Sequence, residues 1–284
     1  MAKIALVTDS TTNIPKELSK GHEIHVVPAV IIWGGETLQD GVDIQPDEFY
    51  KRLASSKESP TTSQPTPAAF KEKFDELASK GFTDIVCSFV SSKFSGTLAS
   101  AEQAKGMVSG VNVSIVDGRS ASMGTGWPLL AAAKAIKAGK SAQECVKILE
   151  SARENTGVVL LVDTLEFLHR GGRIGGGARF LGTALNLKPI LEIQDGALEA
   201  AERVRTKSKA LERLVELLVD RVGGRKPLHL AVLHANARED AKALLAEASK
   251  RIKPDESALT DVSPAVGTHT GPGTLGFAFM AGYK

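Results

Sequence analysis

Asp84-Ile-Val-Cys-Ser-Phe-Val90, residues 96–107 and Val111-Asn-Val-Ser-Ile-Val116 form the stretch that decides the fold. Both apolar runs are nearly continuous, which is typical of strands buried on both faces of a parallel sheet. Residues 96–107 carry apolar side chains at i, i+3 and i+4 spacing and predict the helix that connects the two strands. The stretch therefore predicts a βαβ unit and an α/β protein with a layered sheet.

The same alternation continues on both sides of this unit. Lys3-Ile-Ala-Leu-Val-Thr8 predicts another buried strand, and residues 67–80 and 123–137 predict helices. In open α/β sheets, ligands bind beyond the carboxyl ends of the strands, so we expect functional groups there. Polar turns follow each predicted strand: Asp9-Ser10-Thr11-Thr12-Asn13, Ser91-Ser92 and Asp117-Gly118-Arg119-Ser120.

The alternation breaks twice along the chain. Residues 24–60 contain an apolar run up to Trp33, a Gly34-Gly35 turn and a helix starting near Pro46, and they predict an excursion from the sheet in the form of a flap. After residue 156 the order of predicted strands and helices changes. The pattern of residues 157–284 is as follows: strands at 157–163, 228–233 and about 259–262, helices at 208–221 and 238–251, a glycine-dense loop at 169–177, and a hairpin whose turn is Asp195-Gly196.

These changes predict two domains. Residues 1–156 are expected to form an N-terminal α/β/α domain with a mostly parallel sheet, and residues 157–284 a C-terminal α+β domain with a mixed sheet. No internal repeat interrupts this division.

The amino-acid composition narrows the classes of function that this protein can have. The net charge of +2 comes from 35 basic and 33 acidic residues, and aromatic residues make up 5%, so neither an electrostatic field nor a stacking surface for nucleic acid is expected. No run approaches the roughly 20 apolar residues of a membrane span, and the N-terminus shows no signal-peptide pattern. Cys87 and Cys145 lie in apolar runs without CxxC or zinc spacing, which predicts buried thiols, no metal and no cofactor. We therefore expect a cytoplasmic protein without stable membrane insertion.

The segment Thr268-His269-Thr270-Gly271-Pro272-Gly273 combines two hydroxyls with an imidazole, and we expect a helix to start at its Gly-Pro-Gly end. Hydroxyl donors, an imidazole and the free N–H groups of a helix start together favour the binding of an anion. Thr62-Ser63-Gln64-Pro65 and the turn of residues 91–97 have similar chemistry. We predict that the three turns converge on one pocket for a carboxylate or a phosphate.

Three familiar signatures fail on inspection. Gly271–Gly276 matches GxGxxG, but the few residues that follow, 277–284, cannot supply the rest of a dinucleotide site. Gly139-Lys140-Ser141 lacks the first glycine of a P-loop, since that position is Lys134. His22-Glu23-Ile24-His25 is one residue short of the zinc motif HExxH.

An ordered set of motifs runs through almost the whole chain and resembles the DegV family of bacterial fatty-acid-binding proteins. The motifs are Val7-Thr8-Asp9-Ser10-Thr11-Thr12-Asn13-Ile14-Pro15, Asp40-Gly41-Val42-Asp43-Ile44, Thr62-Ser63-Gln64-Pro65, Phe94-Ser95-Gly96-Thr97, Leu168-His169-Arg170-Gly171-Gly172-Arg173-Ile174, Leu187-Lys188-Pro189-Ile190-Leu191 and Thr268-His269-Thr270-Gly271-Pro272-Gly273. One departure is Gly118, where the family usually has serine or threonine.

The resemblance implies a two-domain α/β protein that encloses one long-chain fatty acid. Such proteins are the non-catalytic, acyl-carrying subunit of a fatty acid kinase, whose separate ATP-dependent subunit phosphorylates the bound carboxylate. By resemblance the ligand-binding residues would be Thr62, Ser95 with its turn Gly96 and Thr97, and His269, with Ser63 and Thr270 as neighbours and Arg170 as a supporting cation. Arg205 resembles a basic position that docks the kinase, although a solvated charge run has the same pattern.

Two other functions remain open at this stage. A serine-type esterase or acyl-phosphate hydrolase would use Ser95 and His269, but the nucleophile motif GxSxG is absent and no acid can be singled out from the sequence. Ser95 equally suits an N-cap of the helix that begins at Thr97. A small-anion sensor for a phosphorylated metabolite is the third possibility.

Overall fold

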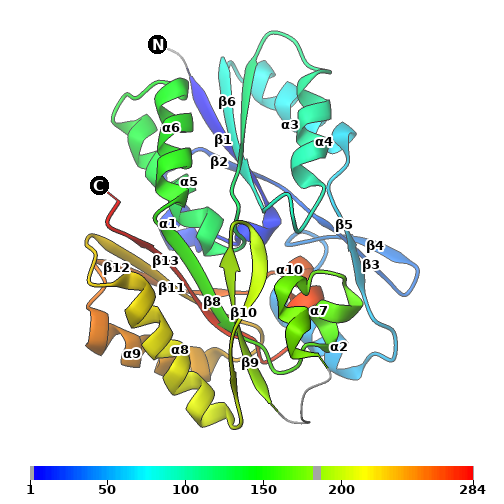
Figure 1. The fold of residues 1–284 in the computed structure, drawn as a ribbon. Helices are drawn as coiled ribbons and strands as arrows, with labels where there is room; N and C mark the ends of the chain where they lie inside the picture. Colours follow the sequence, from blue (N-terminus) through cyan, green and yellow to red (C-terminus); the bar gives the residue numbers. More distant parts are fainter. Residues whose placement is uncertain (1–2, 182–186, 284) are drawn as a thin grey trace.

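The computed structural model describes residues 3–181 and 187–283, which form two principal β-sheets and a smaller one. Figure 1 shows the sheet of the N-terminal half above the sheet of the C-terminal half, with the small sheet at one side. The mixture of a parallel and a mixed sheet agrees with the predicted fold class.

The first sheet is entirely parallel, with the strand order β2-β1-β6-β7. Its strands are β1 (Ile4–Asp9), β2 (Ile24–Val27), β6 (Asp84–Phe89) and β7 (Asn112–Asp117), and its helices are α3 (Pro67–Ser79), α4 (Thr97–Lys105), α5 (Met123–Lys137) and α6 (Ala142–Arg153). Alternate residues of β1 face opposite layers: Ala5 and Val7 pack with α3 and α4, whereas Ile4 and Leu6 pack with α5 and α6. The two cysteines are free and buried, as predicted.

The second sheet is mixed, with the order β10-β9-β8-β13-β11-β12, and its one parallel pair among the described residues is β11 with β12. Its strands are β8 (Thr156–Leu161), β9 (Lys188–Gln194), β10 (Ala197–Val204), β11 (Leu228–His234), β12 (Glu256–Asp261) and β13 (Leu275–Ala281). Helices α8 (Lys207–Val222) and α9 (Arg238–Ile252) cover one face, while the other face turns toward the first sheet (Figure 1).

The excursion is shorter at its start than expected, because Ile24–Val27 is strand β2 of the parallel sheet and not part of a flap. The flap consists of β3 (Val30–Trp33), β4 (Glu36–Gln39), β5 (Thr61–Ser63) and α2 (Pro46–Ser55). Pro28 separates the two strands, since a proline cannot donate to the sheet ladder. The remaining elements are α1 (Lys16–Ser19), α7 (Glu166–Arg170), α10 (Pro264–Thr270), and the 3₁₀ turns η1 (Ser10–Thr12) and η2 (Gly175–Phe180).

The expected helix start at Gly271-Pro272-Gly273 is wrong. Helix α10 ends there, and β13 follows. The helix begins earlier because Pro264 occupies its first turn and the Ser263 side chain accepts a hydrogen bond from Val266 N. Gly271 has a φ of 77°, which ends the helix.

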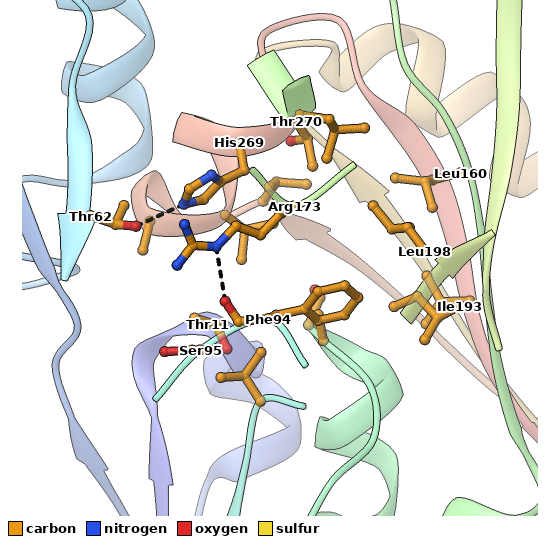
Figure 2. A pocket seen from close by; sticks show the side chains of 18 of the residues that line it. Thr11, Thr62, Phe94, Ser95, Leu160, Arg173, Ile193, Leu198, His269 and Thr270 are labelled. Atoms are coloured by element: carbon orange, nitrogen blue, oxygen red, sulfur yellow. Dashed lines mark hydrogen bonds between the residues drawn. The ribbon is translucent and has the colours of Figure 1, made fainter. Parts of the chain in front are cut away.

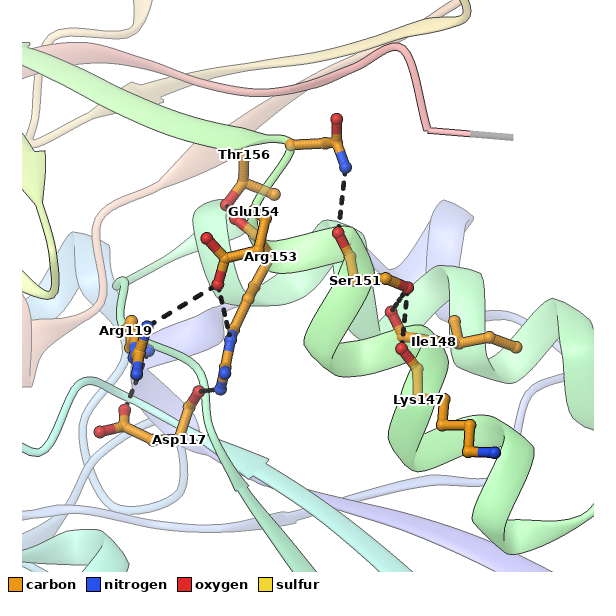
Figure 3. Close-up of polar contacts among 9 residues, drawn as sticks. Asp117, Arg119, Lys147, Ile148, Ser151, Arg153, Glu154 and Thr156 are labelled. Carbon is orange, nitrogen blue, oxygen red and sulfur yellow. Dashed lines mark hydrogen bonds and ion pairs between the residues drawn. The ribbon is translucent and has the colours of Figure 1, made fainter.

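Polar contacts hold the connection between the two halves in place (Figure 3). Arg153, at the end of α6, donates to the carbonyl of Asp117 at 2.8 Å, and Glu154 lies 3.3 Å from Arg153 Nε and 3.7 Å from Arg119. Thr156 Oγ1 donates to the Arg153 carbonyl at 2.7 Å, which fixes the start of β8. The division into domains at residue 156 stays a prediction.

Candidate functional site

A cavity lies between the two principal sheets and the flap, with about 990 Å³ of space between protein atoms when its open mouth is included. Figure 2 shows that its side chains come from both halves of the chain.

Most of the cavity wall is apolar. The aliphatic side chains come mainly from the inner face of the second sheet, where β-strand alternation points every second residue inward. They include Val158 and Leu160 of β8, Ile193 of β9, Leu198 of β10 and Leu233 of β11. Phe94 and Val90, which follow β6, close the opposite side. The wall can therefore enclose a long apolar group.

One end of the cavity is polar. His269, from the last turn of α10, places Nε2 2.7 Å from the hydroxyl of Thr62 on β5 (Figure 2). Ser95 Oγ lies 2.8 Å from Thr97 Oγ1 and accepts a hydrogen bond from Thr97 N at 3.3 Å. These side chains all line the cavity, so the structure brings the three predicted turns together.

His269 is neutral at physiological pH. Burial, together with the nearby positive charge of Arg173, lowers the pKa of its imidazole to about 4. Its Nδ1 is buried and has no hydrogen-bond partner among the residues that the structure describes. A neutral ring can donate from one nitrogen only.

The cation at the polar end is Arg173. Its Nε donates to the Phe94 carbonyl at 3.0 Å and its Nη1 to the Gly171 carbonyl at 2.7 Å, so the guanidinium is fixed at the cavity wall. Arg170, the cation suggested by the resemblance, is exposed, lies outside the cavity and contacts Ser59 and Glu166. Both arginines lie in the same motif, but the turn at Gly171 that ends α7 directs only Arg173 inward.

The remaining residues that the sequence predicted for the site do not all line the cavity. Thr270 lines the cavity, and its buried hydroxyl has no partner in the described part of the chain. Ser63 is exposed and points away from the cavity, toward the Gln64 carbonyl. Gly96, not Ser95, occupies the N-cap position of α4, although the Ser95 hydroxyl still accepts from the first helical N–H. Arg205 is exposed, in the turn between β10 and α8.

The sequence analysis missed five polar residues that line the cavity: Thr11, Gln64, Ser122, Arg173 and Thr274. Of these, Thr11, Gln64 and Arg173 lie inside motifs that it quoted. A motif gives the residue type and the order along the chain, but not which neighbour in a turn faces inward.

The geometry argues against a hydrolase. The hydroxyl of Ser95 bonds to Thr97, and His269 Nε2 bonds to Thr62, so the serine and the histidine are not paired. No described carboxylate orients Nδ1 of His269, as a catalytic triad requires. In the described residues there is also no group of three or more potential metal ligands, and none of the helices is long and apolar enough to cross a membrane.

The fold and the site define an α/β protein with an apolar cavity between two sheets and a polar end made of hydroxyls, an imidazole and a guanidinium. Residues 3–282 match the family model for uncharacterised proteins of the DegV family. The chain is 34% identical over 279 residues to a DegV domain-containing protein of Halalkalibacterium halodurans, an alignment that covers 98% of this chain and 99% of the relative. The chain therefore belongs to the DegV family.

Solved structures of two relatives have the same fold. A fatty-acid-binding DegV family protein from Thermus thermophilus superposes with a TM-score of 0.91 at 36% identity and covers 98% of this chain and 99% of its own. DegV from Bacillus subtilis, a fatty acid binding protein, superposes with a TM-score of 0.90 at 34% identity and covers 99% of this chain and 100% of its own.

Proposed function

We propose that this protein encloses one long-chain fatty acid, with the acyl chain in the apolar part of the cavity and the carboxylate at its polar end. The observation that carries the proposal is the polarity gradient of the cavity, from aliphatic walls to Thr62, Ser95, His269 and Arg173. The fatty-acid-binding relatives from Thermus thermophilus and Bacillus subtilis support the same ligand class.

The energetics favour this ligand. Each CH₂ group buried in an apolar wall contributes about 0.8 kcal/mol, so a long acyl chain supplies much of the affinity. A buried carboxylate is costly unless it accepts several hydrogen bonds. The hydroxyls of Thr62 and Ser95 and the guanidinium of Arg173 are donors for that purpose.

We further propose that the protein acts without catalysis of its own and presents the carboxylate to a separate ATP-dependent kinase that forms the acyl phosphate. The unpaired arrangement of Ser95 and His269 supports a binding role. Arg205, exposed in the turn between β10 and α8 and without an ion pair to any described residue, is available as a docking contact for that partner. Its substitution by alanine is expected to weaken kinase binding and to leave fatty-acid binding unchanged.

The first experiment is mass spectrometry of an organic extract of the purified protein. We expect a stoichiometric C14–C18 fatty acid. A delipidated sample is then titrated with saturated fatty acids of increasing length, and its affinity should rise with chain length because more CH₂ groups are buried.

A clean extract together with no thermal shift on addition of palmitate or oleate would overturn the proposal. An affinity that does not depend on acyl length would instead favour a sensor of small anions. Multiple-turnover hydrolysis of an ester or an acyl phosphate, abolished in Ser95→Ala, would favour the hydrolase.

A further inference from the structure

Position 171 requires glycine because of a neighbouring side chain and not because of its backbone conformation. Its φ of −77° and ψ of −7° suit any residue, so the conformation does not require glycine. A Cβ at this position, however, would lie closer to Nδ1 of His269 than real Cβ contacts allow. The next residue, Gly172, is the opposite case: its φ is 69°, and a Cβ there would meet nothing within 4 Å. The imidazole of His269 therefore packs directly against the Gly171 backbone.

The two ring nitrogens of His269 consequently have different surroundings. Nε2 lies 2.7 Å from Thr62 Oγ1, within hydrogen-bond distance. Nδ1 is buried against the Cα of Gly171 and has no hydrogen-bond partner among the described residues.

The proton of the neutral ring has one favourable position. On Nδ1 it would be a buried, unsatisfied donor directed at the C–H groups of Gly171, which is costly. On Nε2 it donates to Thr62, and the Nδ1 lone pair then faces a C–H group, a weakly attractive contact.

We infer that Gly171 is a positioning residue that holds His269 in the Nε2–H form, so that His269 donates to Thr62 Oγ1 and the Thr62 hydroxyl hydrogen is directed into the cavity. The inference deepens the proposed function, on which it rests for the identity of the group that accepts this hydrogen.

The consequence is a head-group end composed of donors. Thr62 offers its hydroxyl hydrogen, the Ser95–Thr97 pair has a second hydroxyl hydrogen free once one hydroxyl donates to the other, and Arg173 offers its guanidinium. Such a site favours the ionised carboxylate, a charged and therefore stronger acceptor, over the neutral methyl ester and over the fatty alcohol, which carries a donor of its own. A protonated Nε2 also cannot take a proton from Ser95, as a hydrolase would need.

The tautomer can be read directly from the imidazole ¹⁵N signals of the delipidated wild-type protein at pH 7. The chain has six histidines, and the signals of His269 are those that disappear in His269→Gln. We expect Nε2 to be protonated and Nδ1 unprotonated. A proton on Nδ1, or on both nitrogens, would overturn the inference.

Two variants test whether Gly171 sets this state. In Gly171→Ala the ring must move, so its ¹⁵N signals should shift and the affinity for palmitate should fall about tenfold or more. In Gly172→Ala, which strains the backbone without approaching the ring, the His269 signals should stay as in the wild type. Unchanged His269 signals in Gly171→Ala would refute the role of Gly171.

The variant Thr62→Val tests whether Thr62 or Gly171 sets the tautomer of His269. We expect the Nε2–H form to persist, because the contact of Nδ1 with Gly171 remains. A switch to the Nδ1–H form would show that Thr62 sets the tautomer and would overturn the inference. The spectra need no ligand, so the tautomer and the fatty-acid binding can fail independently.

Discussion

At the scale of single residues, neighbours in one strand have opposite roles. Thr62 faces the cavity and bonds to His269, whereas Ser63, the next residue of β5, is exposed and bonds to the Gln64 carbonyl. The alternation of β-strand side chains accounts for this difference.

Thr62→Val keeps the shape of the side chain and removes its hydroxyl. Because hydrogen bonds to a charged group are worth about 1.5–3 kcal/mol, we expect the affinity for palmitate to fall by about 10- to 100-fold, measured by displacement of a fluorescent fatty acid. Ser63→Ala is the matched control and should bind as the wild type does. Equal losses in both variants would contradict the proposed position of the carboxylate.

The residue types of the site were predictable, but the direction of each side chain was not. Thr62, Ser95, Thr97, His269 and Thr270 were selected from sequence, and all of them line the cavity. The choice between two arginines of one motif depends on how the chain turns after α7, which is a property of tertiary packing.

At the scale of elements, α10 is held from several sides because it carries His269. Gly267 packs against the Tyr50 hydroxyl and Gly271 against the Phe167 ring, so closely that neither position has room for a Cβ. Asp40 lies near Ser263 and Ala265, at the first turn of α10, and burial raises the pKa of its carboxyl. Its Oδ2 also accepts a hydrogen bond from Ser10 at 2.7 Å.

Asp40 makes stability depend on pH. Burial outweighs the hydrogen bond from Ser10 and raises the pKa of the Asp40 carboxyl from 3.8 to about 6. The folded state therefore binds more protons than the unfolded state between these values, and its stability falls as the pH rises through this window, by up to about 3 kcal/mol. We expect Asp40→Asn to remove this contribution, so that its free energy of unfolding relative to the wild type increases from pH 4 to pH 7.

Urea unfolding at a series of pH values measures this difference. Asp43→Asn is the control, since Asp43 is an exposed carboxylate in the same motif. A constant difference between Asp40→Asn and the wild type across the range would show that Asp40 does not titrate in the folded protein.

Most elements followed from hydrophobic periodicity. Three strands of the parallel sheet, β1, β6 and β7, and helix α5 were predicted to within about a residue, because continuous apolar runs and helical spacing are local signals. The start of the flap and the end of α10 were not predicted. The first depends on Pro28 and the second on Gly271, and packing decides the effect of each residue.

At the scale of the whole molecule, one hydrophobic core crosses the predicted domain boundary. Trp33 and Phe49 of the flap, Trp127 of α5, and Leu160 and Ala278 of the second sheet belong to the same buried cluster. Trp127 Nε1 also donates to the Ala278 carbonyl at 3.2 Å. The domain division suggested by the sequence rhythm therefore does not imply two independent cores.

A buried hydrogen bond adds a second link between the halves. Ser91, which follows β6, donates from Oγ to the carbonyl of Gly196 in the β9–β10 turn at 2.7 Å. Ser92, its neighbour, donates to Asp117 within the first half.

These links predict that the protein unfolds as one cooperative unit. We expect a single calorimetric transition whose calorimetric and van't Hoff enthalpies agree, and whose midpoint rises with palmitate concentration, because a ligand bound between the halves stabilises both. Ser91→Ala leaves a buried carbonyl unsatisfied and should lower stability by about 1–3 kcal/mol while keeping one transition, whereas Ser92→Ala, at an exposed site, should have a smaller effect. Two transitions, of which palmitate shifts only one, would show instead that the two halves are energetically independent and that the cavity belongs to one of them.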